Sequence, residues 1–171
     1  FCVYVPDEIV FAADAIATGL CGGSQFWVPG GEKVLPTNTC PLIKASVGAR
    51  IDRTCPFFRI ADMYVGETTC DGKKKAWEIL AEDVPVHVMN LPQMKRAKDV
   101  QAWAEEIETF KNIVEEFTGN KVTADKLAES IKLINNKRKA LERLYDLRKN
   151  ETLPISGCDA LLISQIAFYD D

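Results

Sequence analysis

The chain has 171 residues, of which 47% are apolar and 27% are charged, so it is long enough to bury a substantial hydrophobic core. Its formal net charge of −4 gives no electrostatic reason to expect nucleic acid or an anionic membrane as a partner. No uncharged apolar run approaches the roughly 20 residues of a membrane span, and the first residues lack the basic-then-apolar pattern of a signal peptide. The sequence therefore predicts a cytoplasmic protein, in which six cysteines are more typical of metal binding, catalysis or burial than of disulfides.

The first part of the chain, residues 1–93, alternates short apolar segments with helical patterns, which is typical of βαβ units. Strands are expected at 1–5, 63–65 and 86–89, and helices after Pro6, after Pro41 and after Asp71. The first helix is expected to bury a stripe formed by Ile9, Val10, Ala13, Ile16 and Ala17. The glycines and prolines between Gly22 and Thr37 favour a long irregular loop. These patterns predict a Rossmann-like α/β domain with a mostly parallel sheet.

Two long helical patterns follow at 94–150. The first is expected to end at Gly119 and the second to begin after a capping Thr123, which predicts an αα-hairpin packed beside the sheet. Residues 151–171 are expected to form a linker and a helix from about Asp159 to Phe168. Because the chain starts inside a strand and stops just after a helical pattern, we expect it to be an excerpt of a larger two-domain subunit whose C-terminal domain is missing.

Four cysteines, Cys21, Cys40, Cys55 and Cys70, each stand where a short apolar segment meets a glycine, a proline or an aspartate. Thiolates are the ligands that soft metals and iron-sulfur clusters select. The spacings of 19, 15 and 15 residues are too wide for one tight turn, so they leave a shared metal site and four ordinary buried thiols both open. The two Cys-Pro dipeptides favour the metal site, since proline fixes the turn that follows the thiol.

The surroundings of these thiols fit an anionic centre. Cys40 and Cys70 precede predicted helices, whose free N–H groups would stabilise negative charge. Gly22 and Gly23 would let the backbone approach a cofactor, although a simple turn explains them equally well. The run Lys73–Lys75 is interpreted as a solvated helix face, and as a contact for an anionic substrate, cofactor or partner in the alternative.

The remaining chemistry-bearing residues are interpreted as structural. Cys2 lies inside a predicted strand, Cys158 opens the last helix as a packed residue, and His87 alternates with two valines in a strand. The chain lacks the Gly-Lys-Ser/Thr phosphate loop and a complete dinucleotide fingerprint, so ATP or NAD binding by this chain is unsupported. A lone histidine also disfavours a hydrolase triad.

Several strings occur along the chain in a fixed order: Tyr4-Val5-Pro6-Asp7-Glu8-Ile9, Thr39-Cys40-Pro41, Thr69-Cys70-Asp71-Gly72-Lys73-Lys74, Pro85-Val86-His87-Val88-Met89-Asn90-Leu91-Pro92, Thr118-Gly119, Asn135-Asn136-Lys137-Arg138 and Pro154-Ile155-Ser156-Gly157. In this order the chain resembles the 2-hydroxyacyl-CoA dehydratase and benzoyl-CoA reductase family over essentially its whole length. The resemblance implies that Cys40 and Cys70 are two of the three ligands of a 4Fe-4S cluster. The additional Cys21 and Cys55, with the closing segment 161–171, resemble the double-cubane branch, in which six cysteines of one subunit hold two cubanes bridged by a sulfide.

The resemblance therefore implies four metal ligands here, Cys21, Cys40, Cys55 and Cys70, and two more in the missing domain. Cys158 departs from the basic residue expected after Ile-Ser-Gly. The implied activity is that of an oxidoreductase component, a homodimer in an anaerobe's cytoplasm. It would accept low-potential electrons from a separate ATP-hydrolysing iron-sulfur reductase, the activator, and reduce a small-molecule substrate at an 8Fe-9S double cubane. The alternatives are a lyase, namely a 2-hydroxyacyl-CoA dehydratase subunit with one 4Fe-4S cluster, and a non-catalytic metal-storage or assembly protein.

Overall fold

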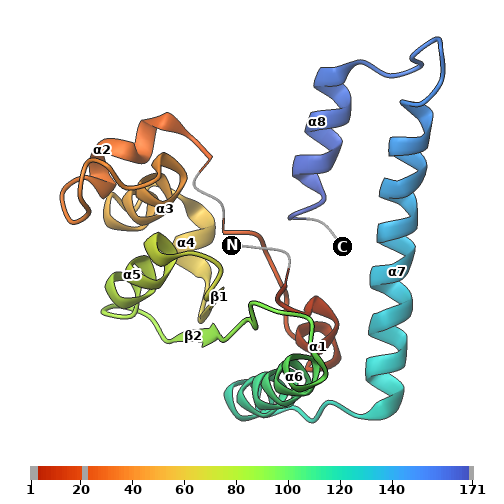
Figure 1. Cartoon of the computed structure of the whole chain (residues 1–171), viewed down its shortest axis with the longest axis horizontal. Helices are drawn as coiled ribbons and strands as arrows, with labels where there is room; N and C mark the ends of the chain where they lie inside the picture. Colours follow the sequence, from red (N-terminus) through yellow and green to blue (C-terminus); the bar gives the residue numbers. More distant parts are fainter. Residues whose placement is uncertain (1–3, 21–22, 170–171) are drawn as a thin grey trace. The chain divides into compact units, whose positions relative to one another are not determined.

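The computed structural model describes residues 4–20 and 23–169 of a mostly helical α/β chain (Figure 1). Its elements in chain order are α1 (Asp7–Ala12), the 3-10 helix η1 (Gln25–Trp27), α2 (Val28–Gly31), α3 (Pro41–Ile51), α4 (Pro56–Ile60), β1 (Tyr64–Glu67), α5 (Asp71–Leu80), β2 (Val86–Met89), α6 (Ala97–Thr118), α7 (Ala124–Leu147) and α8 (Gly157–Ile166). Across the described ranges, none of these helices is both long and apolar enough to cross a lipid bilayer.

The chain divides into two compact units, each assembled from separate stretches of sequence. The first contains Phe1–Val5 and Leu20–Phe110, and the second contains Pro6–Gly19 and Lys111–Asp171. The boundaries of these units differ from those of the domains 1–93, 94–150 and 151–171 that the sequence suggests. The difference arises because α1 belongs to the same unit as α7 and α8. The three sequence domains stay a prediction.

The sheet of the first unit consists, in the described part of the chain, of β1 and β2, which run side by side (Figure 1). They pair in parallel, with a register from Tyr64 opposite Val86 to Glu67 opposite Met89. The predicted strand at 86–89 is confirmed, and the predicted strand at 63–65 is observed at 64–67. Of the expected strand 1–5, residues 1–3 lie outside the described residues, and Tyr4 and Val5 form a turn and a bend. The described sheet is thus parallel but small.

One face of this sheet packs against α5. Side chains alternate along a strand, so Tyr64 and Gly66 share this face with Val86 and Val88. A Cβ added at Gly66 would overlap the ring of Trp77, whose indole N–H donates a hydrogen bond of 3.1 Å to the Glu67 carbonyl oxygen. The core cluster on this side consists of Leu20, Ala49, Cys55, Phe58, Tyr64, Trp77 and Leu80.

The glycine-rich stretch before Thr37 is more ordered than the sequence suggests. It contains η1 and α2, so the expectation of one irregular loop is wrong for this part. Helix α2 packs on α3, and a Cβ added at Gly48 of α3 would overlap the Trp27 carbonyl oxygen. Buried Lys44 secures the connection by donating hydrogen bonds to the Glu32 carboxylate at 2.5 Å and to the Thr37 carbonyl oxygen at 2.6 Å. Small residues here permit close helix contact.

The second unit is built on α1 and α7. Helix α1 begins after Pro6, as predicted, but it ends at Ala12, and Asp14 adopts a left-handed backbone with φ of 56°. The expected stripe is therefore wrong beyond Ala13, since Ile16 is 86% exposed. Helix α7 packs against α1, and Arg138 pairs with Glu8 at 2.7 Å.

The ends of the long helices follow the sequence. Gly119, with φ of 75°, terminates α6, and the Thr123 hydroxyl accepts a hydrogen bond of 3.3 Å from the Lys126 N–H at the start of α7. The predicted αα-hairpin pairs α7 with α6, whereas the main packing partner of α7 is α1. Helix α8 begins at Gly157, two residues before the expected start, and Ser156 caps it through the Asp159 N–H at 3.0 Å.

Candidate metal centre

The three candidate thiols that the structure describes share one local geometry. Cys40, Cys55 and Cys70 each occupy the N-cap position, directly before α3, α4 and α5 respectively, and none of their side chains makes a capping hydrogen bond. Proline follows Cys40 and Cys55 as the first helical residue. The prediction that Cys40 and Cys70 precede helices is confirmed. Cys55 has the same relation to α4, which the sequence analysis missed because five residues are too few for a periodic pattern.

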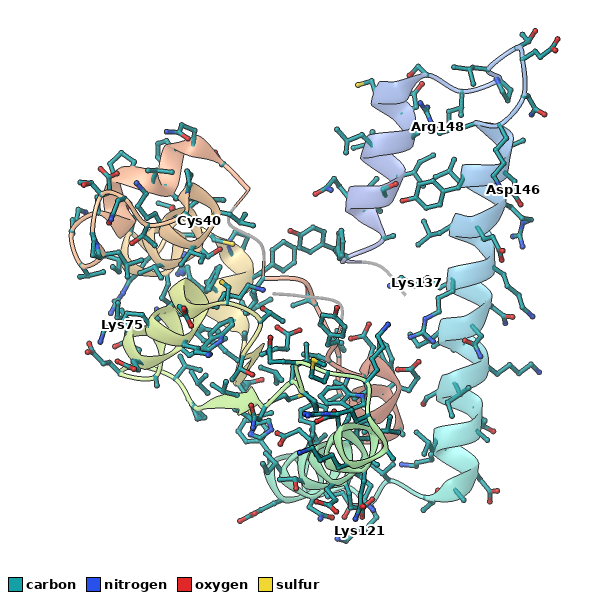
Figure 2. The ribbon with its side chains drawn as sticks, in the orientation of Figure 1. Cys40, Lys75, Lys121, Lys137, Asp146 and Arg148 are labelled. Carbon is teal, nitrogen blue, oxygen red and sulfur yellow. The ribbon has the colours of Figure 1, made fainter. Side chains whose placement is uncertain are left out.

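The starts of α3 and α5 adjoin each other. A Cβ built on Gly72, in the first turn of α5, would lie 2.7 Å from Ile43 Cδ1 and 3.9 Å from Thr39 Cγ2 of the α3 segment. Thr39 directly precedes Cys40, which Figure 2 labels at the start of α3, and Gly72 is two residues after Cys70. Cys40 and Cys70 are both exposed, so the fold brings two accessible thiols to neighbouring helix starts. Thiolate sulfur is the form of cysteine that binds iron.

Cys55 lies in a different environment. Its side chain is buried within the core cluster that contains Phe58 and Tyr64. The Tyr64 hydroxyl donates a hydrogen bond of 2.8 Å to the Phe58 carbonyl oxygen. Burial raises the pKa of Tyr64, Arg50 counteracts that shift, and Asp83 and Cys55 add to it. The Cys55 thiol is thus held in apolar surroundings.

The remaining proposed ligand, Cys21, and the proposed cofactor-binding Gly22 lie outside the described residues, and Gly23 is exposed just before η1. The described flanks of this stretch both approach Cys55. Leu20 belongs to the same core cluster as Cys55, and the Trp27 indole N–H donates a 2.6 Å hydrogen bond to the Thr54 hydroxyl, one residue before Cys55.

Cys40, Cys55 and Cys70 offer the thiol donors that an iron-sulfur cluster needs, and each of them lies at the start of a helix. In residues 4–20 and 23–169, however, no three side chains of His, Cys, Asp or Glu gather closely enough to hold a metal ion. The shared site formed by Cys21, Cys40, Cys55 and Cys70 therefore stays a prediction.

Two ionisable groups lie on the sheet face opposite α5. Glu67 is fully buried; its Oε1 accepts the Tyr4 N–H at 3.4 Å, and its Oε2 has no hydrogen-bond partner. The His87 ring stacks on Phe110, with centroids 5.7 Å apart, and its Nε2 lies 3.9 Å from Glu106 Oε1. Burial lowers the pKa of His87, and Glu106 partly opposes this shift. The sequence analysis missed Glu67 because its place on this face becomes visible only once the strand register is known.

Comparison with known proteins identifies the relatives of this chain. The family model for the 2-hydroxyglutaryl-CoA dehydratase D-component matches residues 2–171. The chain belongs to this family. It is 42% identical over 164 residues to "Putative dehydratase subunit YjiM" of Escherichia coli (strain K12), an alignment that covers 95% of this chain and 43% of YjiM. It is 26% identical over 167 residues to a benzoyl-CoA reductase subunit of Thauera aromatica, an alignment that covers 94% of this chain and 42% of that relative.

The predicted family is thus confirmed, and the chain spans less than half the length of these two relatives. Proteins of the D-component family typically carry iron-sulfur clusters, which agrees with helix-start cysteines as donors. The names of the relatives include both a dehydratase subunit and a reductase subunit. Family membership alone therefore leaves the reaction class open.

Outside the candidate ligands, the structure corrects one interpretation. Cys158 is exposed in the first turn of α8, so its interpretation as a packed residue is wrong; the buried residue of that turn is Ala160. In the lysine run, Lys74 pairs with Asp71 at 3.4 Å and Lys75 pairs with Glu78 at 2.5 Å. These exposed pairs agree with a solvated helix face.

Proposed function

We propose that this chain is the cluster-holding part of a reductase component with a double-cubane 8Fe-9S centre. The observation that supports this proposal is the local geometry of Cys55. It repeats that of Cys40, with the thiol at an N-cap and proline at the next position, and the described flanks of Cys21 pack beside it. A single cluster at Cys40 and Cys70 would leave the second Cys-Pro helix start without a role.

In this proposal Cys21, Cys40, Cys55 and Cys70 hold the centre, which supplies low-potential electron transfer when bound. The chain's own contribution is electrostatic. The N-terminal N–H groups of α3 and α5 lie next to Cys40 and Cys70, where they face an anionic centre. The apolar residues around Cys55 exclude water from the buried side of the site.

The partners in this proposal are a separate ATP-hydrolysing iron-sulfur reductase, a second copy of the same polypeptide and a small-molecule substrate. In this proposal the separate reductase hydrolyses ATP. We assign no nucleic acid and no membrane partner.

The alternative is a 2-hydroxyacyl-CoA dehydratase subunit with one 4Fe-4S cluster. Two observations favour it. Cys40 and Cys70 are exposed at adjoining helix starts, whereas Cys55 is buried among apolar side chains, as an ordinary structural cysteine would be. The relative at 42% identity also carries the name of a dehydratase subunit.

Iron and acid-labile sulfide per subunit of the anaerobically purified full-length protein separate the two functions. About eight irons are expected for the double cubane and about four for the single cluster. Cys55→Ser should roughly halve the iron content in the first case and leave it unchanged in the second. Cys158→Ser is the matched control, since this exposed thiol lies in the second unit, and it should keep full iron content in both cases.

A wild-type iron content of about four that Cys55→Ser leaves intact would overturn the double-cubane proposal. Turnover that requires both ATP and a reductase partner would contradict the storage or assembly alternative.

A further inference from the structure

Helix α8 carries large apolar side chains that the described part of the chain leaves uncovered (Figure 1). Those that are exposed in α8 and just beyond its end are Leu161, Leu162, Ile163, Ile166, Phe168 and Tyr169. Leu161 is 61% exposed and Leu162 is 57% exposed. Single exposed apolar residues are common on protein surfaces, but several adjacent ones mark a surface that another element covers.

These side chains leave the helix in several directions. Successive residues of an α-helix are turned by about 100°, so the consecutive Leu161, Leu162 and Ile163 point to three different sides. Ala160, which is buried, takes the fourth side. Ile166 follows Leu162 by four residues and extends its stripe. A helix that is apolar on all sides belongs in a protein interior.

The polar groups of α8 agree with this placement. No charged residue occurs from Ala160 to Ile166, and the Ser164 hydroxyl donates a hydrogen bond of 2.8 Å to the Ala160 carbonyl oxygen within the helix. The first turn differs, because Asp159 is charged and the space around Gly157 is open. The first turn, which includes exposed Cys158, therefore belongs to the surface.

The breadth of this apolar surface favours one occupant. A second copy that packs about a two-fold axis would cover one side of α8 and leave the others in water. The relatives suggest an occupant that reaches several sides. The alignments cover 43% of YjiM and 42% of the reductase subunit, so each relative is more than twice as long as the part that matches this chain.

We propose that, in a polypeptide of the relatives' length, α8 is a core helix enclosed by further elements of the same polypeptide. Those elements present apolar faces to Leu161, Leu162 and Ile163, and the first turn of α8 stays accessible to water. The enclosure of α8 does not depend on the metal centre, so it is tested separately from the proposed function.

The test is the rate at which iodoacetamide alkylates a cysteine placed on this surface in the full-length protein. In Leu162→Cys the new thiol should react at least about tenfold more slowly than Cys158, which is the accessible reference in the same helix. Lys132→Cys, at an exposed position of α7, is the matched control and should react about as fast as Cys158. A thiol at position 162 that reacts as fast as Cys158 would overturn the inference.

A charge at the same position distinguishes the two occupants. An interior without a partner for the charge does not tolerate arginine, so full-length Leu162→Arg should lose its cooperative unfolding transition or become insoluble. Cys158→Arg adds the same charge to the accessible first turn and should stay folded. Circular dichroism and light scattering measure folding and mass. A folded Leu162→Arg monomer from a dimeric wild type would assign the surface to a second copy, and a folded variant of unchanged mass would show that it faces water. Either result contradicts the enclosure of α8.

Discussion

His87 is a residue whose side chain binds a proton less readily in the folded protein than in the unfolded chain. Burial lowers its pKa from the ordinary value of 6.5, with Glu106 opposing the shift. An unfolded chain therefore binds the proton at a higher pH than the folded chain does. The contribution of the neutral ring to stability is complete above about pH 6.5 and is lost as the pH falls toward the lower folded pKa.

We expect the wild-type free energy of unfolding to fall from about pH 7.5 to about pH 5.5, and His87→Phe to lose less over the same range. Denaturant unfolding at several pH values measures both. Arg96 lowers the pKa of Asp99 and Lys121 lowers the pKa of Glu115, so these two carboxylates titrate at more acidic pH than this window. Parallel pH profiles for the two proteins would contradict the prediction.

At the residue scale, the sequence could predict that Cys40 and Cys70 stand at helix starts, but it missed Cys55 and could not show which thiols are buried. The Cys-Pro and Cys-Asp steps mark the helix starts at Cys40 and Cys70 directly. Cys55 is buried in the core cluster that also contains Phe58, Tyr64 and Trp77, and this cluster forms only when the unit folds. No local pattern carries that information.

At the element scale, the length of a helix decides whether the sequence can predict it. Helices α6 and α7 have 22 and 24 residues, enough for a repeated apolar face, and their inner ends at Gly119 and Thr123 carry recognisable signals. Helices α2 and α4 have four and five residues, so neither shows a period. Helix α1 stops early because the backbone turns left-handed at Asp14, which an apolar count cannot reveal.

The N-cap of α7 gives a quantitative prediction at this scale. Thr123→Ala removes the hydroxyl that accepts the Lys126 N–H, and it should lower the free energy of unfolding by about 1 kcal/mol. Thr109→Ala is the control, because the Thr109 hydroxyl donates to the Glu105 carbonyl inside α6 and satisfies no free helix N–H. Its effect should stay within about 0.5 kcal/mol. Equal losses in the two variants, measured by denaturant unfolding, would contradict a capping role.

At the scale of the whole molecule, the pairing of distant elements could not be predicted. Apolar periodicity shows which face of α7 must be covered, but it does not identify the covering element. In the second unit that element is α1, held by Glu8 to Arg138 and by Asp14 to Lys126 across more than a hundred residues. The same limit applies to the candidate site, because the contact of Gly72 with Ile43 that joins the starts of α3 and α5 is also non-local.

Reactivity of the cysteines toward iodoacetamide tests the proposed metal centre. Without metal, Cys40, Cys70 and Cys158 are exposed and should be alkylated readily, whereas Cys55 is buried and should react only on unfolding. In the iron-loaded full-length protein, the proposed function expects Cys40 and Cys70 to become protected, because ligation to iron would occupy their sulfurs. Cys158 serves as an internal control in the same sample, since it is exposed but not a proposed ligand, and its rate should be the same in both states.

Mass spectrometry measures the extent of alkylation of each cysteine-containing peptide. The measurement is made before and after anaerobic iron chelation. We expect chelation to increase alkylation of Cys40 and Cys70 at least tenfold relative to Cys158, because a sulfur bound to iron is not available as a nucleophile. If Cys40 and Cys70 react as fast as Cys158 in protein that retains its iron, they do not bind the metal. The iron would then have to be held by other residues, and the adjoining starts of α3 and α5 would have only a structural role.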